Sequence, residues 1–203
     1  MSVALEKAHQ YEEREIPKIP LDQKPAFLVA APIGWINDPY GFSYYDGQYH
    51  LFYQYNPYEP HWGSIHWGHA VTKDFLHWEY LPAALAPDEA YDRDGCFSGS
   101  ALTLPDGRQL LMYTGVLRER KENGEHCDTQ TQCLAVGDGV DYEKCAGNPV
   151  LDKNDIPEGS SVHDFRDPKM WQAEDGTYCC VVGNRPADGS GQILLYTSPD
   201  GFQ

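Results

Sequence analysis

The sequence predicts an all-β protein, part of a β-propeller, with one short helix at its N-terminus. Glycine (19) and proline (15) are frequent, and β-branched and aromatic residues alternate between turn signals about every 8–12 residues, as is typical of short strands. Asp-Gly pairs, the strongest short-range hairpin signal, stand at 46–47, 106–107 and 175–176, at spacings of 60 and 69 residues.

The first element is the helix, which we place at residues 2–15. This segment is rich in glutamate, has no apolar run and ends before Pro17, and a residue that precedes proline disfavours helical backbone. It has neither the apolar stretch of a signal peptide nor that of a membrane span. We therefore divide the chain into an N-terminal polar segment, 1–24, and a β domain, 25–203.

Three units of similar pattern make up the β domain. In each unit a strand passes through the Asp-Gly turn into a second strand, and a further strand and a second turn follow. The second turns lie at 72–75, 137–141 and 198–202, and residues 77–80 supply a fourth strand in the first unit. Four antiparallel strands per repeat at this period are typical of propeller blades. A β-sandwich with coincidentally spaced turns is the alternative.

The third unit reaches Gln203 where its fourth strand should begin. We therefore expect about three blades, the last one incomplete. Blades bury their faces against neighbours, and three alone would leave apolar faces and strand edges open. The chain is thus expected to be the N-terminal part of a longer protein.

Composition limits the classes of partner. The 203 residues carry 31 Asp and Glu against 15 Lys and Arg, a formal net charge of −16. This balance argues against nucleic acid and anionic membrane surfaces, and it is compatible with a neutral ligand such as a sugar. The six cysteines form no C-x-x-C pair, and without a secretion signal we interpret them as thiols of a cytoplasmic protein, with disulfides the less favoured alternative.

Metal and cofactor motifs are missing from the sequence. Five of the eight histidines lie between His50 and His77, but His66 and His69 would face opposite sides of a strand, and no H-E-x-x-H occurs. We therefore expect structural histidines and no metal site. The sequence also has no P-loop, no G-x-G-x-x-G and no G-x-S-x-G, so we expect no cofactor.

Two Asp-Pro segments are the candidate catalytic elements. Asp38 stands in Trp-Ile-Asn-Asp-Pro-Tyr-Gly-Phe (35–42) and Asp167 in Phe-Arg-Asp-Pro (165–168). Paired carboxylates on stiff turns suit glycoside chemistry, in which one attacks or stabilises the sugar and another handles protons. The alternative for Asp38 is a turn cap. Arg166 could form a structural ion pair with Asp167, or bind another partner because adjacent strand residues face opposite ways.

Aromatic and amide residues crowd the segment between these aspartates, at 52–57, 61–63 and 65–70. Flat aromatic faces stack on sugar rings and amides hydrogen-bond to hydroxyls. Most of these residues are expected to belong to the β core. Gln54, Trp62 and Trp67 are the three that we place in the site.

Five segments, in order, resemble motifs of glycoside hydrolase family 32, which contains invertases, sucrose-6-phosphate hydrolases and fructan exo-hydrolases. They are Trp-Ile-Asn-Asp-Pro-Tyr-Gly (35–41), Phe-Tyr-Gln-Tyr-Asn-Pro (52–57), Trp-Gly-His-Ala (67–70), Phe-Ser-Gly-Ser-Ala (97–101) and Phe-Arg-Asp-Pro (165–168). The resemblance covers roughly residues 25 to 203. It implies a five-bladed propeller followed by a β-sandwich, with the active site in the central funnel of the propeller.

The resemblance also implies roles for these residues. Asp38 would attack the anomeric carbon of a β-linked fructosyl unit, and Asp167 would stabilise the transition state with Arg166 beside it. The reaction would be retaining, through a covalent fructosyl-enzyme. The implied lining of the fructosyl subsite is Asn37, Gln54, Trp62, Phe97 and Ser98.

Two positions depart from the family pattern. Residue 40 is tyrosine where asparagine is usual, which bears on the leaving group or chain length accepted. The general acid of the family is a glutamate in a Glu-Cys pair after Arg-Asp-Pro, and no Glu-Cys occurs here; Glu174, the only later glutamate, adjoins a turn. General acid catalysis contributes about 10²–10⁴-fold, so we expect the piece alone to be nearly inactive.

The sequence therefore predicts a glycoside hydrolase that releases terminal β-D-fructofuranosyl residues from sucrose, sucrose 6-phosphate or a fructan. Two alternatives stay open. The first is a non-catalytic propeller that binds fructosides, and the second is a fructosyltransferase, which would use a sugar in place of water as acceptor.

Overall fold

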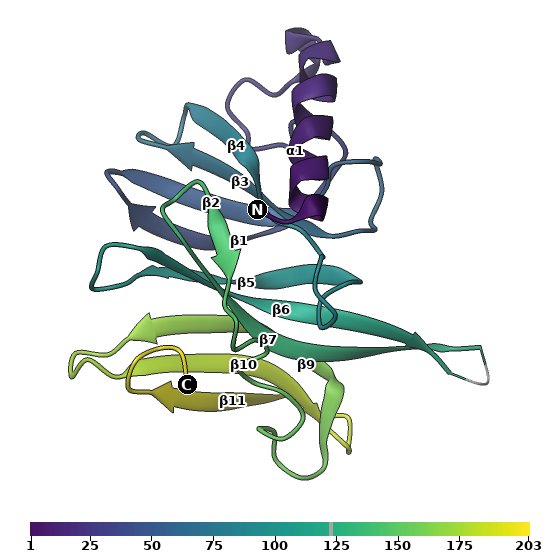
Figure 1. Ribbon diagram of the computed structural model, residues 1–203, viewed down its shortest axis with the longest axis vertical. Coiled ribbons are helices and arrows are strands. Elements are labelled where there is room, and N and C mark those ends of the chain that lie inside the picture. The colour runs from purple at the N-terminus through teal and green to yellow at the C-terminus, as the bar shows by residue number, and fades with distance from the viewer. Residues whose placement is uncertain (122–123) are drawn as a thin grey trace.

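A computed structural model of the protein describes residues 1–121 and 124–203 (Figure 1). Within these residues the helix α1 (Val3–Glu15) precedes two short 3-10 helices, η1 (Ile16–Lys18) and η2 (Leu21–Gln23), and three antiparallel sheets. The first sheet contains β1 (Trp35–Tyr45), β2 (Gln48–Asn56), β3 (His66–Thr72) and β4 (Trp78–Leu85). The second contains β5 (Gly95–Thr103), β6 (Gln109–Arg120), β7 (His126–Gly137) and β8 (Tyr142–Lys144). The third contains β9 (Ser160–Gln172), β10 (Tyr178–Pro186) and β11 (Gln192–Ser198).

In every sheet, each strand pairs with the strand that follows it in the chain. The Asp-Gly turns join the first two strands of each sheet, as the sequence predicts. At the first turn both Asp46 and Gly47 have positive φ, 45° and 80°, which is the backbone that favours Asp-Gly in two-residue hairpins. The fourth strand predicted at 77–80 is confirmed as β4, and the helix predicted at 2–15 is confirmed as α1.

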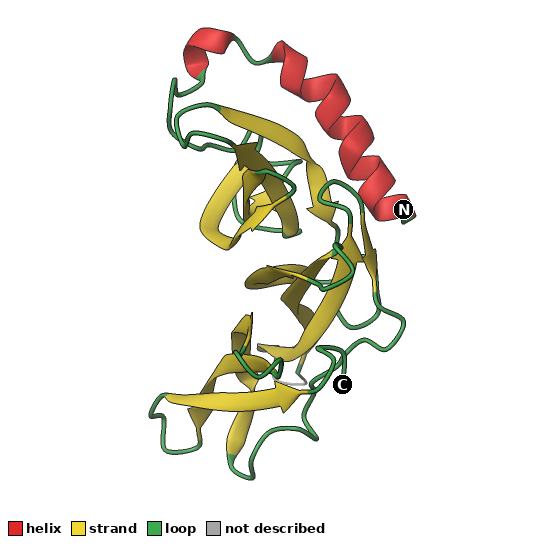
Figure 2. Ribbon diagram, turned by 90° about the vertical axis from the view of Figure 1, so that its left-hand side faces the viewer, coloured by secondary structure: helices red, strands yellow, loops and turns green. Residues whose placement is uncertain are grey.

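The sheets follow one another as an arc, and their first strands β1, β5 and β9 pack in that order (Figure 2). The middle sheet buries both faces. Along β6, Leu111 and Tyr113 join a cluster with the first sheet, whereas Leu110 and Met112 join a cluster with the third. This period of two is what a strand between two neighbours requires. The arrangement confirms propeller blades, the third with three strands, and excludes the β-sandwich alternative.

Helix α1 lies on the outer strand of the first blade. The side chain of its N-cap residue, Ser2, accepts a hydrogen bond from Leu5 N–H, and Leu5 and Ala8 are buried in the first-blade core. Glu12 is 5% exposed and accepts a hydrogen bond from Ala83 N–H, while His9 Nε2 lies 2.8 Å from the Ala83 carbonyl oxygen. The helix thus covers backbone groups of an edge strand. One face of the helix is therefore buried, although the sequence indicates a polar segment. The division of the chain at residue 24 stays a prediction.

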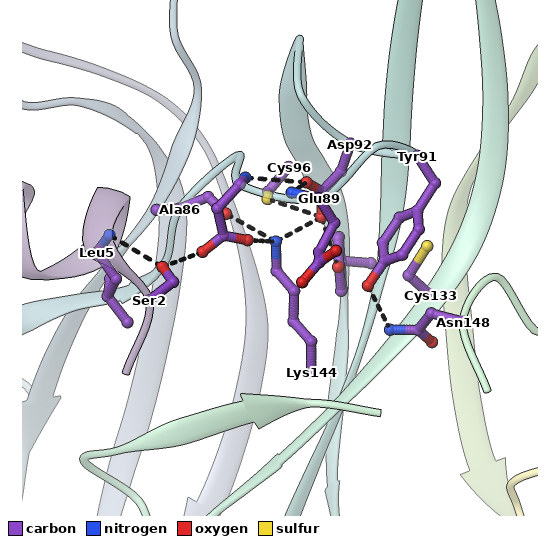
Figure 3. A network of polar contacts seen from close by, with 12 residues as sticks. Ser2, Leu5, Ala86, Glu89, Tyr91, Asp92, Cys96, Cys133, Lys144 and Asn148 are labelled. Atoms are coloured by element: carbon purple, nitrogen blue, oxygen red, sulfur yellow. Dashed lines mark hydrogen bonds and ion pairs between the residues drawn. The ribbon is translucent and has the colours of Figure 1, made fainter. Parts of the chain in front are cut away.

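A buried polar cluster joins the first blade to the second (Figure 3). Lys144, at the end of β8, binds Asp88 and places Nζ 2.5 Å from Asp92 Oδ2. Asp92 also accepts a hydrogen bond from the Tyr113 hydroxyl at 2.8 Å, and Ser2 binds Asp88. The cluster therefore ties the outer strand of the second blade, the segment between the blades and the start of α1.

No helix among the described residues is long and apolar enough to cross a membrane.

Candidate active site

A β-bulge interrupts the first strand of each blade, and a candidate site residue occupies each bulge. On β1, Asn37 pairs with Gln54 and Pro39 pairs with Tyr53, so Asp38 is the extra residue between them. Its φ of 33° is positive, a region that aspartate tolerates better than most residues. Bulges commonly re-aim side chains next to active sites. Here the bulge leaves the carboxylate of Asp38 exposed.

The second and third blades repeat this device. On β5 the extra residue is Ser98. On β9 Asp167 and Pro168 together lie opposite Val182, and Asp167 has a φ of 64°. Because β5 packs against both β1 and β9, the three bulges belong to neighbouring strands. The bulge in each first strand thus explains why these three residues have no regular partner in the ladder.

A chain of side-chain hydrogen bonds connects the first two bulges. Trp35 Nε1 donates to Asn37 Oδ1 at 2.7 Å, and Asn37 Nδ2 donates to Gln54 Oε1 at 3.0 Å. Gln54 Nε2 then donates to Ser98 Oγ at 2.9 Å. Gln54 and Ser98 are 5% and 8% exposed, so the hydrogen bonds of Gln54 are shielded from water and fix its amide orientation before any ligand arrives. The structure therefore brings together three of the predicted subsite residues.

The two aspartates share an electrostatic environment. The Asp167 side chain is 59% exposed. The protein around it removes part of its hydration and raises the pKa of Asp167, Arg166 opposes this rise, and the charge of Asp38 adds to it. Asp38 and Asp167 therefore lie close enough to influence each other. A carboxylate pair of this kind suits a reaction that develops positive charge on a sugar.

Arg166 has two acidic neighbours. Its Nη1 lies 3.0 Å from Asp164 Oδ1, whereas its Nε lies 3.8 Å from Asp167 Oδ2. Gln130 Oε1 accepts a further hydrogen bond from Arg166 Nη1 at 3.3 Å. The sequence left open whether Arg166 pairs with Asp167 or with another residue. In the structure it contacts both Asp167 and Asp164, and Asp164 is the closer partner. The guanidinium is held at the side of Asp167.

The exposed Trp62 and the half-buried Phe97 form an aromatic edge beside the bulges. Their rings meet edge to face at 6.0 Å between centroids, and Trp62 is 41% exposed. The Arg118 guanidinium lies 5.4 Å from the Trp62 ring centroid and pairs with Asp128 through two hydrogen bonds. A tryptophan fixed in this way leaves part of its ring free to stack on a ligand.

Trp67 does not join this surface, which corrects the prediction that it binds the substrate. It is 0% exposed, and its Nε1 donates to the Phe97 carbonyl oxygen at 2.9 Å. Tyr40 packs on it at 4.5 Å between ring centroids and, like Trp67, belongs to the core between the first two blades. Trp67 therefore supports the backbone of Phe97 and has no free face for a sugar.

Sequence reasoning missed three buried polar residues of the second blade, Thr114, Gln130 and Gln132. Thr114 Oγ1 accepts a hydrogen bond from Asp167 N–H at 3.1 Å, and Gln130 Oε1 accepts one from Phe165 N–H at 3.0 Å. The sequence contained a weak signal, because Gln130 and Gln132 stand at alternate positions of one strand, directly before its apolar run from Cys133 to Val136. Their partners on β9 could not be inferred from it.

Among the described residues, three histidines and three cysteines are buried, namely His50, His66, His69, Cys96, Cys133 and Cys180. His50 Nδ1 and His69 Nε2 lie 2.9 Å apart in the core, and no group of metal ligands occurs among residues 1–121 and 124–203. All six cysteines fall in this described part and are free thiols. Burial raises the pKa of Cys133 to about 12. Glu174 lies in the exposed turn between β9 and β10.

Comparison with known proteins agrees with this geometry. Residues 29–203 match the model of the glycosyl hydrolases family 32 N-terminal domain. A raffinose invertase of Escherichia coli is 45% identical over 175 residues, and a sucrose-6-phosphate hydrolase of the same species is 43% identical over 173 residues; each alignment covers 85% of this chain and 34% of the relative. The chain thus spans about a third of the length of these curated relatives.

Solved structures match over most of the chain. A GH32 β-fructofuranosidase of Bombyx mori superposes with a TM-score of 0.84 at 38% identity, over 98% of this chain and 40% of that one. Fructan 1-exohydrolase IIa of Cichorium intybus gives a TM-score of 0.75 at 35% identity, over 91% and 34%. With its bulged blades and its match over residues 29–203, the chain belongs to glycosyl hydrolase family 32.

Proposed function

We propose that this chain supplies the nucleophile and the transition-state stabiliser of a retaining β-fructofuranosidase. The observation that carries this proposal is the placement of Asp38 and Asp167 at bulges on β1 and β9, both of which pack against β5, where the charge of Asp38 contributes to the raised pKa of Asp167. Asp38 has no ladder partner and is exposed. It can therefore approach a sugar from the strand surface without disturbing the blade.

In the proposed reaction, a carboxylate oxygen of Asp38 forms a bond to the anomeric carbon of the fructosyl unit while the glycosidic C–O bond breaks. The leaving oxygen takes a proton from a general acid, and water later hydrolyses the fructosyl ester. Asp167 accepts hydrogen bonds from fructose hydroxyls, and its negative charge favours the oxocarbenium-like transition state. No Glu-Cys pair occurs within these 203 residues, so a segment beyond them would supply the acid.

The substrate class follows from the site and from the relatives. Asn37, Gln54 and Ser98 offer preset hydrogen-bonding groups, and the exposed edge of Trp62 offers a face for a sugar ring. The relatives are named for raffinose, sucrose 6-phosphate and fructan, and one matching structure holds sucrose. We propose a terminal fructoside such as sucrose, handled without a cofactor. The six free thiols support a cytoplasmic location.

The test is sucrose hydrolysis by the full-length product of the reading frame that contains this chain. Asp38→Asn should lower kcat by roughly 10³-fold or more, because the amide cannot act as the nucleophile. Asp46→Asn is the matched control, since Asp46 is exposed in a turn that accepts asparagine equally well. Mass spectrometry of a trapped intermediate should find the fructosyl group on the peptide that contains Asp38.

Two outcomes would contradict the proposal. Sucrose binding without any turnover, with an affinity that Asp38→Asn leaves unchanged, would support a non-catalytic fructoside-binding propeller. Transfer of fructose to sucrose in preference to water would instead indicate a fructosyltransferase.

A further inference from the structure

Asp167 depends on the second blade for its backbone geometry. Its φ of 64° lies in the left-handed region, and the bulge removes it from the β9–β10 ladder. An N–H group at a bulge loses its partner within the sheet. Here Asp167 N–H donates to Thr114 Oγ1 at 3.1 Å instead. Thr114 belongs to β6, in the neighbouring blade.

The polarity of this contact is set by Gln132. Gln132 Nε2 donates to the Phe165 carbonyl oxygen at 2.7 Å, which leaves its Oε1 as an acceptor. Thr114 Oγ1 donates its single proton to that Oε1 at 2.9 Å, in preference to the Ser98 carbonyl oxygen at 3.4 Å. A lone pair of Thr114 is then left for Asp167 N–H. Each hydrogen bond thus determines the next one.

Burial makes this arrangement rigid. Thr114, Gln132 and Phe165 are all 0% exposed, so water cannot replace a lost partner without a rearrangement, and an unsatisfied buried group is costly. The same Thr114 lies opposite Phe97 in the ladder beside the Ser98 bulge. Thr114 therefore connects the Asp167 bulge with the Ser98 bulge. From Ser98, hydrogen bonds lead through Gln54 to Asn37, the residue before Asp38.

We infer that Thr114, oriented by Gln132, is the positioning residue that sets the Asp167 carboxylate for the reaction; this role rests on the proposed function. Thr114 does not touch the substrate. It acts through the backbone of Asp167, which it holds in an unfavourable conformation. Catalysis of this kind depends on such pre-set geometry, because a small displacement of a charged group weakens its effect on the transition state.

The experiment compares Thr114→Val with Thr114→Ser in the full-length protein. Valine keeps the shape of threonine but removes the acceptor, so kcat should fall about 10- to 100-fold while KM stays within about threefold. Serine keeps the hydroxyl and should restore kcat to within about threefold of the unmodified protein. Thr131→Val is the matched control, because Thr131 lies on the adjacent strand β7 and, within the part of the chain that the structure describes, its hydroxyl hydrogen-bonds with Cys133 Sγ alone, at 3.8 Å.

A double-mutant cycle separates positioning from a general loss of structure. If Thr114 acts through Asp167, then Thr114→Val should reduce kcat little further in an Asp167→Asn background, since effects that share one residue are not additive. Full additivity would overturn the inference. So would a serine variant as slow as the valine variant, or a valine variant with unchanged kcat.

Amide hydrogen exchange tests the contact without any activity. Thr114→Val should accelerate exchange in the peptide that contains Asp167, relative to the Thr131→Val control. Accelerated exchange in a protein that shows no fructosidase activity would uphold the positioning contact and refute the proposed function. Unchanged exchange would refute the positioning contact itself.

Discussion

The buried cluster around Lys144 gives the most demanding test of how the blades are held together. Lys144 and Asp88 have side chains that are 11% and 12% exposed, and Asp92 is fully buried. Burial alone would lower the pKa of Lys144, but the neighbouring Cys96, Asp92 and Asp88 outweigh it and raise that pKa. The lysine is therefore charged and neutralises two carboxylates that are withdrawn from water.

Lys144→Met removes the charge and keeps most of the volume. Breaking a buried ion pair from one side costs about 3–5 kcal/mol, because the remaining charges are left uncompensated. For a chain of this size each kcal/mol lowers Tm by roughly 2–4 °C, so we expect Tm to fall by roughly 6–20 °C. The assay is thermal and urea unfolding followed by circular dichroism.

Two further variants make this test discriminating. Lys153→Met, at an exposed lysine, should change Tm by no more than about 2 °C, since isolated surface charges contribute little. Adding Asp92→Asn to Lys144→Met should recover part of the loss, because it removes one of the uncompensated charges. A Tm for Lys144→Met equal to that of Lys153→Met would refute the reasoning.

Two other predictions concern stability. Burial lowers the pKa of His66 to about 4, below the 6.5 of the unfolded chain, so this group's contribution to the free energy of unfolding should be fully present above pH 6.5 and fall by about 3 kcal/mol as the pH drops to 4. Urea unfolding should show this loss in the unmodified protein and in the exposed-site control His126→Gln, but a smaller loss in His66→Gln. A loss in His66→Gln as large as that in His126→Gln would contradict the prediction. Gly99→Ala would place its Cβ 1.9 Å from the Met112 carbonyl oxygen, so we expect the free energy of unfolding to fall by about 2 kcal/mol or more. Gly191→Ala, where a Cβ would meet open space, should leave that free energy nearly unchanged in the same assay.

The fold could be predicted from local signals. The Asp-Gly turns set the hairpins, and their spacing set the blade length, because both depend on residues that are near one another in the chain. The two-sided burial of β6 also follows from its continuous apolar run, from Leu110 to Tyr113. The helix was predicted in place, but its packing on β4 depends on contacts between residues more than 70 positions apart.

The site was predicted only in part, for a physical reason. Sequence patterns singled out Asp38 and Asp167 as candidates, but the bulges that expose them result from the register between two strands. The partner of Asp167, Thr114, lies 53 positions away and on another blade. Trp62 and Trp67 have similar neighbours in the sequence, yet Trp67 lies inside a fully buried strand while Trp62 lies outside any strand. Membership of a paired strand and packing between blades decide between them.

Under the proposed function, the three bulges separate residues that hold the sheets together from residues that act on the substrate. The paired residues of β1, β5 and β9 hold the blades together, while Asp38, Ser98 and Asp167 stand between paired positions. Such residues have no cross-strand partner in the ladder, so folding constrains them through backbone conformation and burial and not through strand pairing. A scaffold built in this way can acquire a different activity by exchanging a few inserted side chains, without redesigning the sheets that carry them.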